Sequence, residues 1–280
     1  MDAFTPREAA LEYWFWTFHA GDLAFLTDFI VRRRTGEGEI RISLWVRGQG
    51  RVEHFRTAEW SADSKRITIG DGPLAPDGST GAVDDIAWNL RWSTGEQAIS
   101  PTPGLSGRAN PLDMKFLLRP DARFDGFVRI GGETFAVAKE PGSFTHYWGR
   151  RLPDQWLWIS ATRFEGHPEQ RLEAAIGRSR LWGRFPMPTP ISYVWITDGG
   201  RSELTVSPLN GLVRKRRDGD TIAIDVRRWN GQRHRITCRA GTSQNDLGEG
   251  IRQTLLGELT LDGLSAVAGT VGIETRGWPL

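Results

Sequence analysis

Short runs in which apolar and polar residues alternate recur along the whole chain. In residues 40–46 and 221–227 every second side chain is apolar. Because successive side chains of a β-strand point to opposite faces, this period predicts strands that bury one face. Further strands of similar composition are predicted at residues 13–19, 23–34 and 51–60, with turns at residues 21–22 and 36–39. The pattern therefore predicts an antiparallel, almost entirely β protein.

Pairs of turn-forming residues separate these runs. The pairs are Gly131-Gly132, Gly199-Gly200, Asn210-Gly211, Asp218-Gly219, Asn230-Gly231 and Asp262-Gly263. They supply the positive φ angles that tight hairpins require. Helix signals are few: residues 5–8 could cap one short turn, and residues 168–176 could form another. With 33 Gly in the chain, long helices are not expected.

The hairpins fall into two series of similar length. Residues 95–111 are rich in Pro, Gly and Ser and predict a long surface loop inside the first series. Residues 140–143 separate the first series from the second, which predicts two β units, residues 1–140 and 141–280. About eight strands can close into a barrel without exposed edges. Each unit is therefore expected to be an antiparallel barrel or a barrel-like sandwich.

Composition and charge narrow the class of protein. The single cysteine, Cys238, can form neither an internal disulfide nor a thiolate metal site. No long uncharged apolar segment predicts a membrane span, and the acidic residues near the start do not fit a signal peptide, so a cytoplasmic protein is expected. The net charge is +2, and the basic runs 214–217 and 32–34 are interpreted as a solvated turn and a strand end. No nucleic-acid partner is expected, and the sequence does not indicate an oligomeric state.

The tryptophan residues are the basis for a hypothesis about ligand binding. The chain contains 13 Trp, and several of them stand beside polar or ionisable residues. Aromatic rings with polar groups between them suit a pocket for an apolar molecule, whereas a single Trp more often fills a core. The candidate ligand-binding residues are Trp88, Trp92, Tyr147, Trp148, Trp156, Trp158 and Trp195.

Motifs that would define a reaction are missing from the sequence. It contains no nucleotide-binding loop, zinc-protease motif or nucleophile elbow, and no spacing of His, Asp and Glu suggests a metal site. No metal is predicted. His146 is the best candidate for acid–base chemistry, because it stands beside Tyr147 and shares a strand face with Trp148. The alternative is a hydrogen-bonded hairpin residue without a catalytic role.

Three segments carry a resemblance to a known family. Residues 146–159, HYWGRRLPDQWLWI, resemble the W-G-x-x-(F/L)-P-x-x-W-x-W signature of tocopherol cyclase-like and hydroxyneurosporene synthase (carotenoid 1,2-hydratase)-like proteins, a superfamily that includes AttH-like proteins. Residues 12–16 are similar to the acidic-then-aromatic opening of these proteins, and residues 271–277 to their Glu-x-x-Gly ending. The chain departs from the pattern at Ser160 and Thr162, where many relatives carry Gln and Asn. No single member's reaction is therefore carried over.

The resemblance implies a lipocalin-like, calycin-type fold with two β-barrel-type domains and an apolar ligand of isoprenoid or polyketide type. It also implies chemistry without a cofactor, in which an acid protonates an alkene or assists a ring closure beside aromatic rings that stabilise positive charge. The candidate acids are Glu274, Asp84, Asp85 and Asp154. A carboxylate that faces solvent or pairs with Arg is the alternative for each of them.

Three functional hypotheses remain open from the sequence. The first is an enzyme that cyclises or hydrates an apolar molecule. The second is a carrier of such a molecule without catalysis, and the third is a structural or interaction module in which every Trp belongs to a core. A protonatable group at the ligand distinguishes the enzyme from the carrier, and a ligand pocket distinguishes the carrier from the structural module.

Overall fold

The computed structural model describes residues 4–94, 98–101, 114–181, 184–187, 189–198 and 201–278. Throughout these ranges the regular structure is antiparallel β-sheet, and none of it is helical. The predicted all-β class is confirmed. The described chain forms two compact units: unit 1 holds the residues up to Leu152 except Gly48–Gly50 and Pro101, and unit 2 holds those residues and the chain from Pro153 onward.

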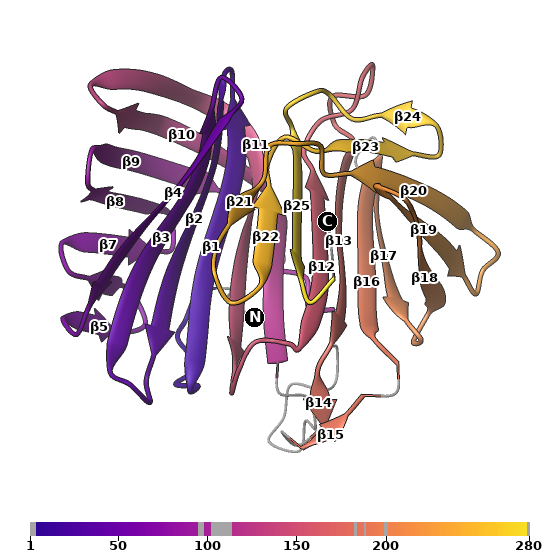
Figure 1. Cartoon of the computed structure of the whole chain (residues 1–280), viewed down its shortest axis with the longest axis horizontal. Coiled ribbons are helices and arrows are strands. Elements are labelled where there is room, and N and C mark those ends of the chain that lie inside the picture. Colours follow the sequence, from indigo (N-terminus) through magenta and orange to yellow (C-terminus); the bar gives the residue numbers. More distant parts are fainter. Residues whose placement is uncertain are drawn as a thin grey trace. The chain divides into compact units, whose positions relative to one another are not determined.

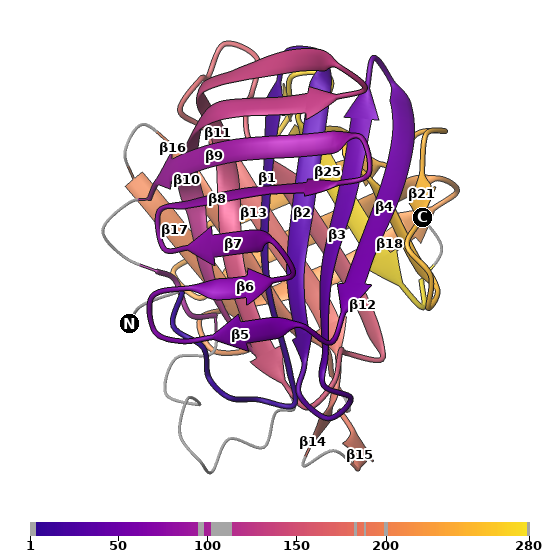
Figure 2. The same cartoon turned by 90° about the vertical axis from the view of Figure 1, so that its left-hand side faces the viewer.

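Unit 1 is built on one 11-stranded antiparallel sheet (Figures 1 and 2). In spatial order its strands are β4 (Gln49–Thr57), β3 (Glu37–Val46), β2 (Leu23–Arg32), β1 (Leu11–Ala20), β11 (Glu133–Gly149), β10 (Met114–Ile130), β9 (Ile86–Ser93), β8 (Gly78–Val83), β7 (Gly72–Ala75), β6 (Ile67–Ile69) and β5 (Trp60–Ala62). Neighbours in this order are consecutive in the chain except for β1 and β11. That one long-range pairing joins two series of hairpins, and Figure 2 shows the series from β5 to β9 as successive turns of a meander.

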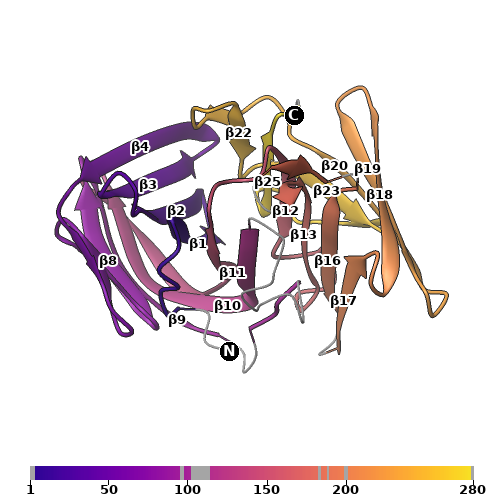
Figure 3. The same cartoon turned by 90° about the horizontal axis from the view of Figure 1, so that it is seen from below.

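The sheet of unit 1 curls until it is nearly closed (Figure 3). Close to one end of the sheet, Gly38 of β3 lies directly against the short strands of the other end. A Cβ atom on Gly38 would lie 3.0 Å from the Cβ of Trp60 in β5 and 3.1 Å from a methyl group of Ile69 in β6. Glycine permits this close approach of the two ends, and a larger residue would force them apart. The unit is therefore barrel-like.

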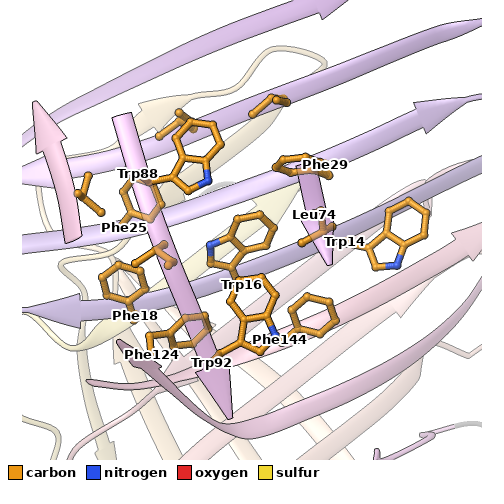
Figure 4. Close-up of a cluster of buried hydrophobic side chains, with 14 of the residues drawn as sticks. Trp14, Trp16, Phe18, Phe25, Phe29, Leu74, Trp88, Trp92, Phe124 and Phe144 are labelled. Atoms are coloured by element: carbon orange, nitrogen blue, oxygen red, sulfur yellow. The ribbon is translucent and has the colours of Figure 1, made fainter. Parts of the chain in front are cut away.

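Aromatic rings fill the interior of unit 1 (Figure 4). The ring of Trp16 in β1 packs against Trp92 in β9 and Phe29 in β2, with centroid distances of 5.3 and 5.4 Å. Phe18 of β1 packs against Phe124 of β10 at 5.2 Å. Because these rings come from strands far apart in the sequence, their burial holds the curled sheet together.

Unit 2 contains two sheets that share one core. The seven-stranded sheet has the order β17 (Arg201–Ser207), β16 (Ile191–Asp198), β13 (Arg171–Arg178), β12 (Gln155–Ala161), β25 (Val271–Arg276), β22 (Ile251–Thr254) and β21 (Asn245–Asp246). The five-stranded sheet has the order β18 (Gly211–Asp218), β19 (Thr221–Arg228), β20 (Arg233–Arg239), β23 (Glu258–Leu261) and β24 (Leu264–Ser265), and β14 (Arg180–Leu181) pairs with β15 (Phe185–Pro186). Figure 3 shows β18 and β19 facing β13 and β16. Ile176 of β13 and Ile224 of β19 belong to the core of this unit.

Three local predictions from the sequence are wrong. Residues 5–8 are not helical, and Glu8 has a φ of 57°. Most of the predicted helix 168–176 is part of β13, because Leu172, Ala174 and Ile176 alternate into the core with the period of a strand. The basic run 214–217 is not a turn but lies within β18.

Two other predictions concern the loop at residues 95–111 and the boundary between the units. Most of the predicted loop 95–111 lies outside the described residues, and within the described part Ile99 forms a bridge with Leu118. The boundary expected after residue 140 falls inside β11, and the compact units divide after Leu152. The division of the chain into two lipocalin-like domains stays a prediction. None of the described segments is a helix with the length and apolarity needed to cross a membrane.

Phe124 and Phe127 of β10 provide a matched test of the aromatic core. Phe124 is fully buried, whereas Phe127 is 37% exposed. Replacing Phe124 by Ala is expected to lower the free energy of unfolding by about 3–5 kcal/mol, because it removes a ring from the packed interior. Phe127→Ala is expected to cost less than about 1 kcal/mol. Urea denaturation measures both, and equal losses would contradict this assignment of the core.

Candidate functional site

His146, the predicted acid–base residue, lies in the interior of unit 1. It is directly opposite Trp14 in the pairing of β11 with β1. The imidazole stacks on the Trp14 ring with centroids 4.6 Å apart and tilts against Trp148 at 4.9 Å. The predicted shared face of His146 and Trp148 is therefore confirmed. The side chain of His146 has no exposed surface.

Glu12 is the buried partner of His146. Its Oε2 lies 3.3 Å from His146 Nε2 and accepts the backbone N–H of Arg7 at 2.8 Å, while Oε1 accepts the N–H of Ala9 at 2.8 Å. Arg33 Nη2 approaches Oε1 to 3.6 Å. Burial alone would raise the pKa of Glu12, but the hydrogen bonds from His146 and the two backbone N–H groups outweigh it and lower the pKa. This enclosed pair is typical of a structural polar group, and a catalytic role for His146 stays a prediction.

Asp84 and Asp85 form the exposed turn between β8 and β9. Arg51 binds Asp85 at 2.5 Å and Glu53 at 2.5 Å. A hydrogen bond with Glu53, followed by burial and by the charge of Glu53, raises the pKa of Asp84. None of these residues is a partner of His146. Asp84 and His146, both predicted to be catalytic, therefore belong to separate clusters.

The aromatic candidates of unit 1 lie on two faces of its sheet. Trp88 and Trp92 belong to the interior, and each donates its indole N–H to an oxygen of the same unit at 2.9 Å. Trp148 packs against this interior. Tyr147 points to the opposite face, where its ring stacks on Tyr13 with centroids 4.7 Å apart. A ligand-binding role for these four residues stays a prediction.

Unit 2 brings the other candidates onto one face of its seven-stranded sheet. The strand register pairs Trp158 of β12 with Glu274 of β25, and Trp156 lies two positions before Trp158 on the same face. On the other side of β12, the register places Glu173 of β13 opposite Trp195 of β16. The aromatic face is defined here as Trp156, Trp158, Glu173, Tyr193, Trp195, Gln253 and Glu274. Neighbouring residues such as Leu157, Ala174 and Val194 point the other way, into the core.

Two carboxylates on the aromatic face are each held by an indole N–H. Trp156 Nε1 donates to Glu274 Oε1 at 2.8 Å, and Gln253 Nε2 donates to Oε2 at 2.7 Å. Trp158 Nε1 and the hydroxyl of Tyr193 both donate to Glu173 Oε1, at 3.4 and 3.2 Å. Glu173 is only 1% exposed. Carboxyl groups fixed against aromatic rings can deliver a proton beside π surfaces that stabilise positive charge.

Trp195 adds an available donor to the aromatic face. Its indole N–H is buried, and no described residue accepts a hydrogen bond from it. Buried donors are nearly always paired in folded proteins, so this N–H suits a polar group of a bound molecule. Among the described residues, no group of three or more His, Cys, Asp or Glu is placed to hold a metal ion.

Sequence reasoning missed Glu173, Tyr193 and Gln253. Glu173 falls within the wrongly predicted helix, so its position on the face of a strand was not recognised. The alternation of apolar residues around it was the signal that could have identified the strand. Gln253 lies in β22, a strand too short to produce a clear period. Asp154, by contrast, was a candidate acid, and it pairs with Arg180 at 3.0 Å near the surface.

The buried pair of unit 1 predicts a pH-dependent contribution to stability. Because the folded pKa of Glu12 lies below its ordinary value of 4.5, ionised Glu12 stabilises the folded state above pH 4.5. That contribution is lost as the pH falls through the folded pKa. Glu12→Gln is therefore expected to lower stability at neutral pH by about 1–3 kcal/mol and to remove part of the loss on acidification.

Denaturation of Glu12→Gln at a series of pH values measures this effect, with the exposed Glu59→Gln as the control. His146→Gln is expected to destabilise by a similar amount, because His146 contacts Glu12 from a fully buried position. A melting temperature within a few degrees of wild type, together with reduced ligand affinity, would instead place His146 in an accessible site.

Comparison with solved structures establishes the fold. The sequence matches no protein-family model and no curated protein. The structure is similar to that of a candidate AttH protein from Nitrosomonas europaea, with a TM-score of 0.67, 14% identity, and coverage of 100% of this chain and 96% of the other. It is also similar to kievitone hydratase from Nectria haematococca, with a TM-score of 0.62, 11% identity, and coverage of 98% and 91%. The lipocalin-like fold implied by residues 146–159 is thereby confirmed, and this chain shares its fold with both proteins.

Proposed function

We propose that this protein binds an apolar small molecule of isoprenoid or polyketide type at the aromatic face of unit 2 and catalyses an acid-assisted hydration or cyclisation there, without a cofactor. The observation that carries the proposal is the pair of carboxylates, Glu173 and Glu274, each bound by an indole N–H within one aromatic surface. Apolar rings with a few placed polar groups are the usual composition of a small-molecule site.

The proposed reaction uses one carboxyl group at a time. A protonated carboxyl transfers its proton to an alkene carbon, and the electron pair of the double bond forms the new C–H bond. The carbocation that remains lies against an indole ring, whose π face attracts positive charge. Water, or a hydroxyl or second alkene of the same molecule, then supplies the electron pair for the new bond, and the proton released passes to the second carboxylate. Exchange with water then removes that proton and reprotonates the first carboxylate.

Glu173 and Glu274 differ in burial and in hydrogen-bond partners, and we propose different roles for them in the reaction. Glu173 is the more deeply buried and lies between Trp158 and Tyr193, so it is proposed as the proton donor. Glu274 is partly exposed and is bound by Gln253, an arrangement suited to a group that accepts a proton from water. The name of one similar structure, kievitone hydratase, supports hydration as the first reaction to test.

A second candidate function is carriage of the same ligand without catalysis. Each carboxylate already accepts hydrogen bonds from two side chains, which satisfies a buried polar group without any reaction. In that case the aromatic rings bind the apolar molecule, and the carboxylates only orient the indoles.

Replacement of each carboxylate tests the catalytic proposal. The protein is incubated with a panel of isoprenoid and prenylated compounds that includes kievitone, and mass spectrometry detects a product heavier by one water or an isomer with altered retention. Glu173→Gln is expected to lower the rate by about 10²–10⁴-fold, because it removes the proton donor while keeping the shape of the side chain. Glu274→Gln is expected to lower it as well, and Glu165→Gln at an exposed position is the control.

Two other results decide between an enzyme, a carrier and a protein with neither function. Saturable quenching of Trp fluorescence by these compounds with no product would contradict catalysis and favour the carrier. Neither quenching nor product across the panel would contradict both functions.

A further inference from the structure

A second candidate site lies in unit 2, on the other side of the seven-stranded sheet from the aromatic face. It is a pocket of about 800 Å³ beside β18, the edge strand of the five-stranded sheet. Its apolar lining includes Ile176, Val213, Val226 and Trp278. Because Ile176 and Glu173 are three positions apart on β13, they project to opposite faces. The pocket is therefore distinct from the aromatic face, and its volume suits a small organic molecule.

The charged lining of the pocket is strongly basic. Seven lining residues are Lys or Arg, and two are Asp. Both acids already have partners. Asp225 is paired with Arg216, and Asp262 accepts hydrogen bonds from His234 Nδ1 at 2.7 Å and from the backbone N–H of Arg235 at 2.7 Å. Because side chains alternate along β18 and β19, Arg214, Arg216 and Arg227 project to the face opposite Val213 and Val226. Lys215 of β18 and Arg178 of β13 are therefore the lining cations on the apolar side of the pocket.

Lys215 is the cation most closely associated with the apolar part of the pocket. Its Nζ lies 3.3 Å from the centroid of the Trp278 ring. Burial, followed by the nearby charges of Arg217 and Arg178, lowers the pKa of Lys215 to about 8. Among the described residues, no carboxylate pairs with Lys215. An anion beside it would therefore relieve the repulsion between these cations.

We propose that this pocket binds an amphipathic organic anion, whose apolar body lies against Ile176, Val213 and Trp278 and whose acidic head group lies between Lys215 and Arg178. A carboxylate and a phosphate share the chemistry that the cations recognise. The proposal does not depend on the reaction proposed for the aromatic face.

Titration calorimetry with three ligands of equal chain length tests the proposal. Dodecanoate and dodecyl phosphate carry the two acidic head groups, and dodecanol is the uncharged control. Both anions are expected to bind, and dodecanol is expected to bind at least about tenfold more weakly, because it gains no charge-assisted hydrogen bond. The relative affinities of the two anions identify the preferred head group.

Variants assign the binding to this pocket. Lys215→Gln and Arg178→Gln are each expected to weaken dodecanoate binding by about five- to tenfold and to leave dodecanol unchanged. Lys65→Gln, at an exposed position of unit 1, is the control that also removes one positive charge. Denaturation curves verify that each variant is folded. Equal affinity for dodecanol and dodecanoate, or full dodecanoate affinity in both folded pocket variants, would overturn the proposal.

Discussion

The alternation of side chains across the β-sheet is the constraint on which both units depend. In β13, Leu172 and Ile176 enter the core of unit 2, and the same pleat places Glu173 on the opposite face. In β1, the pleat directs Trp14 and Trp16 into the interior of unit 1. A slip of one residue in either pairing would exchange the two faces, so register decides which side chains are available for chemistry.

The pairing of strands supplies partners to the buried carboxylates Glu12 and Glu173. Glu12 and His146 meet because β1 pairs with β11, and Trp14 covers the imidazole from one side. On the aromatic face of unit 2, the indole N–H groups of Trp156 and Trp158 satisfy Glu274 and Glu173. An unpaired buried carboxylate would cost several kcal/mol, so each pair stabilises the sheet that also positions it.

Local alternation was sufficient to predict the all-β class and the shared faces of His146 with Trp148 and of Trp156 with Trp158. Partners that come from distant segments could not be predicted, because Glu12 and His146 are 134 residues apart in the chain. The basic run 214–217 was read as a turn from its composition alone. In the structure it lies in β18, which forms a hairpin with β19 and is the edge strand beside a pocket.

We assign ligand binding to the aromatic face of unit 2 and packing to the aromatic interior of unit 1. The most direct measurement follows the indole ¹⁵N–¹H signals of the protein during titration with farnesol, each signal being assigned by a Trp→Phe substitution. We expect saturable shifts for Trp156 and Trp158, whose N–H groups bind the two carboxylates. Trp16 and Trp88 in the interior of unit 1 should remain unchanged. Shifts confined to Trp16 and Trp88, with Trp156 and Trp158 unmoved, would contradict this assignment.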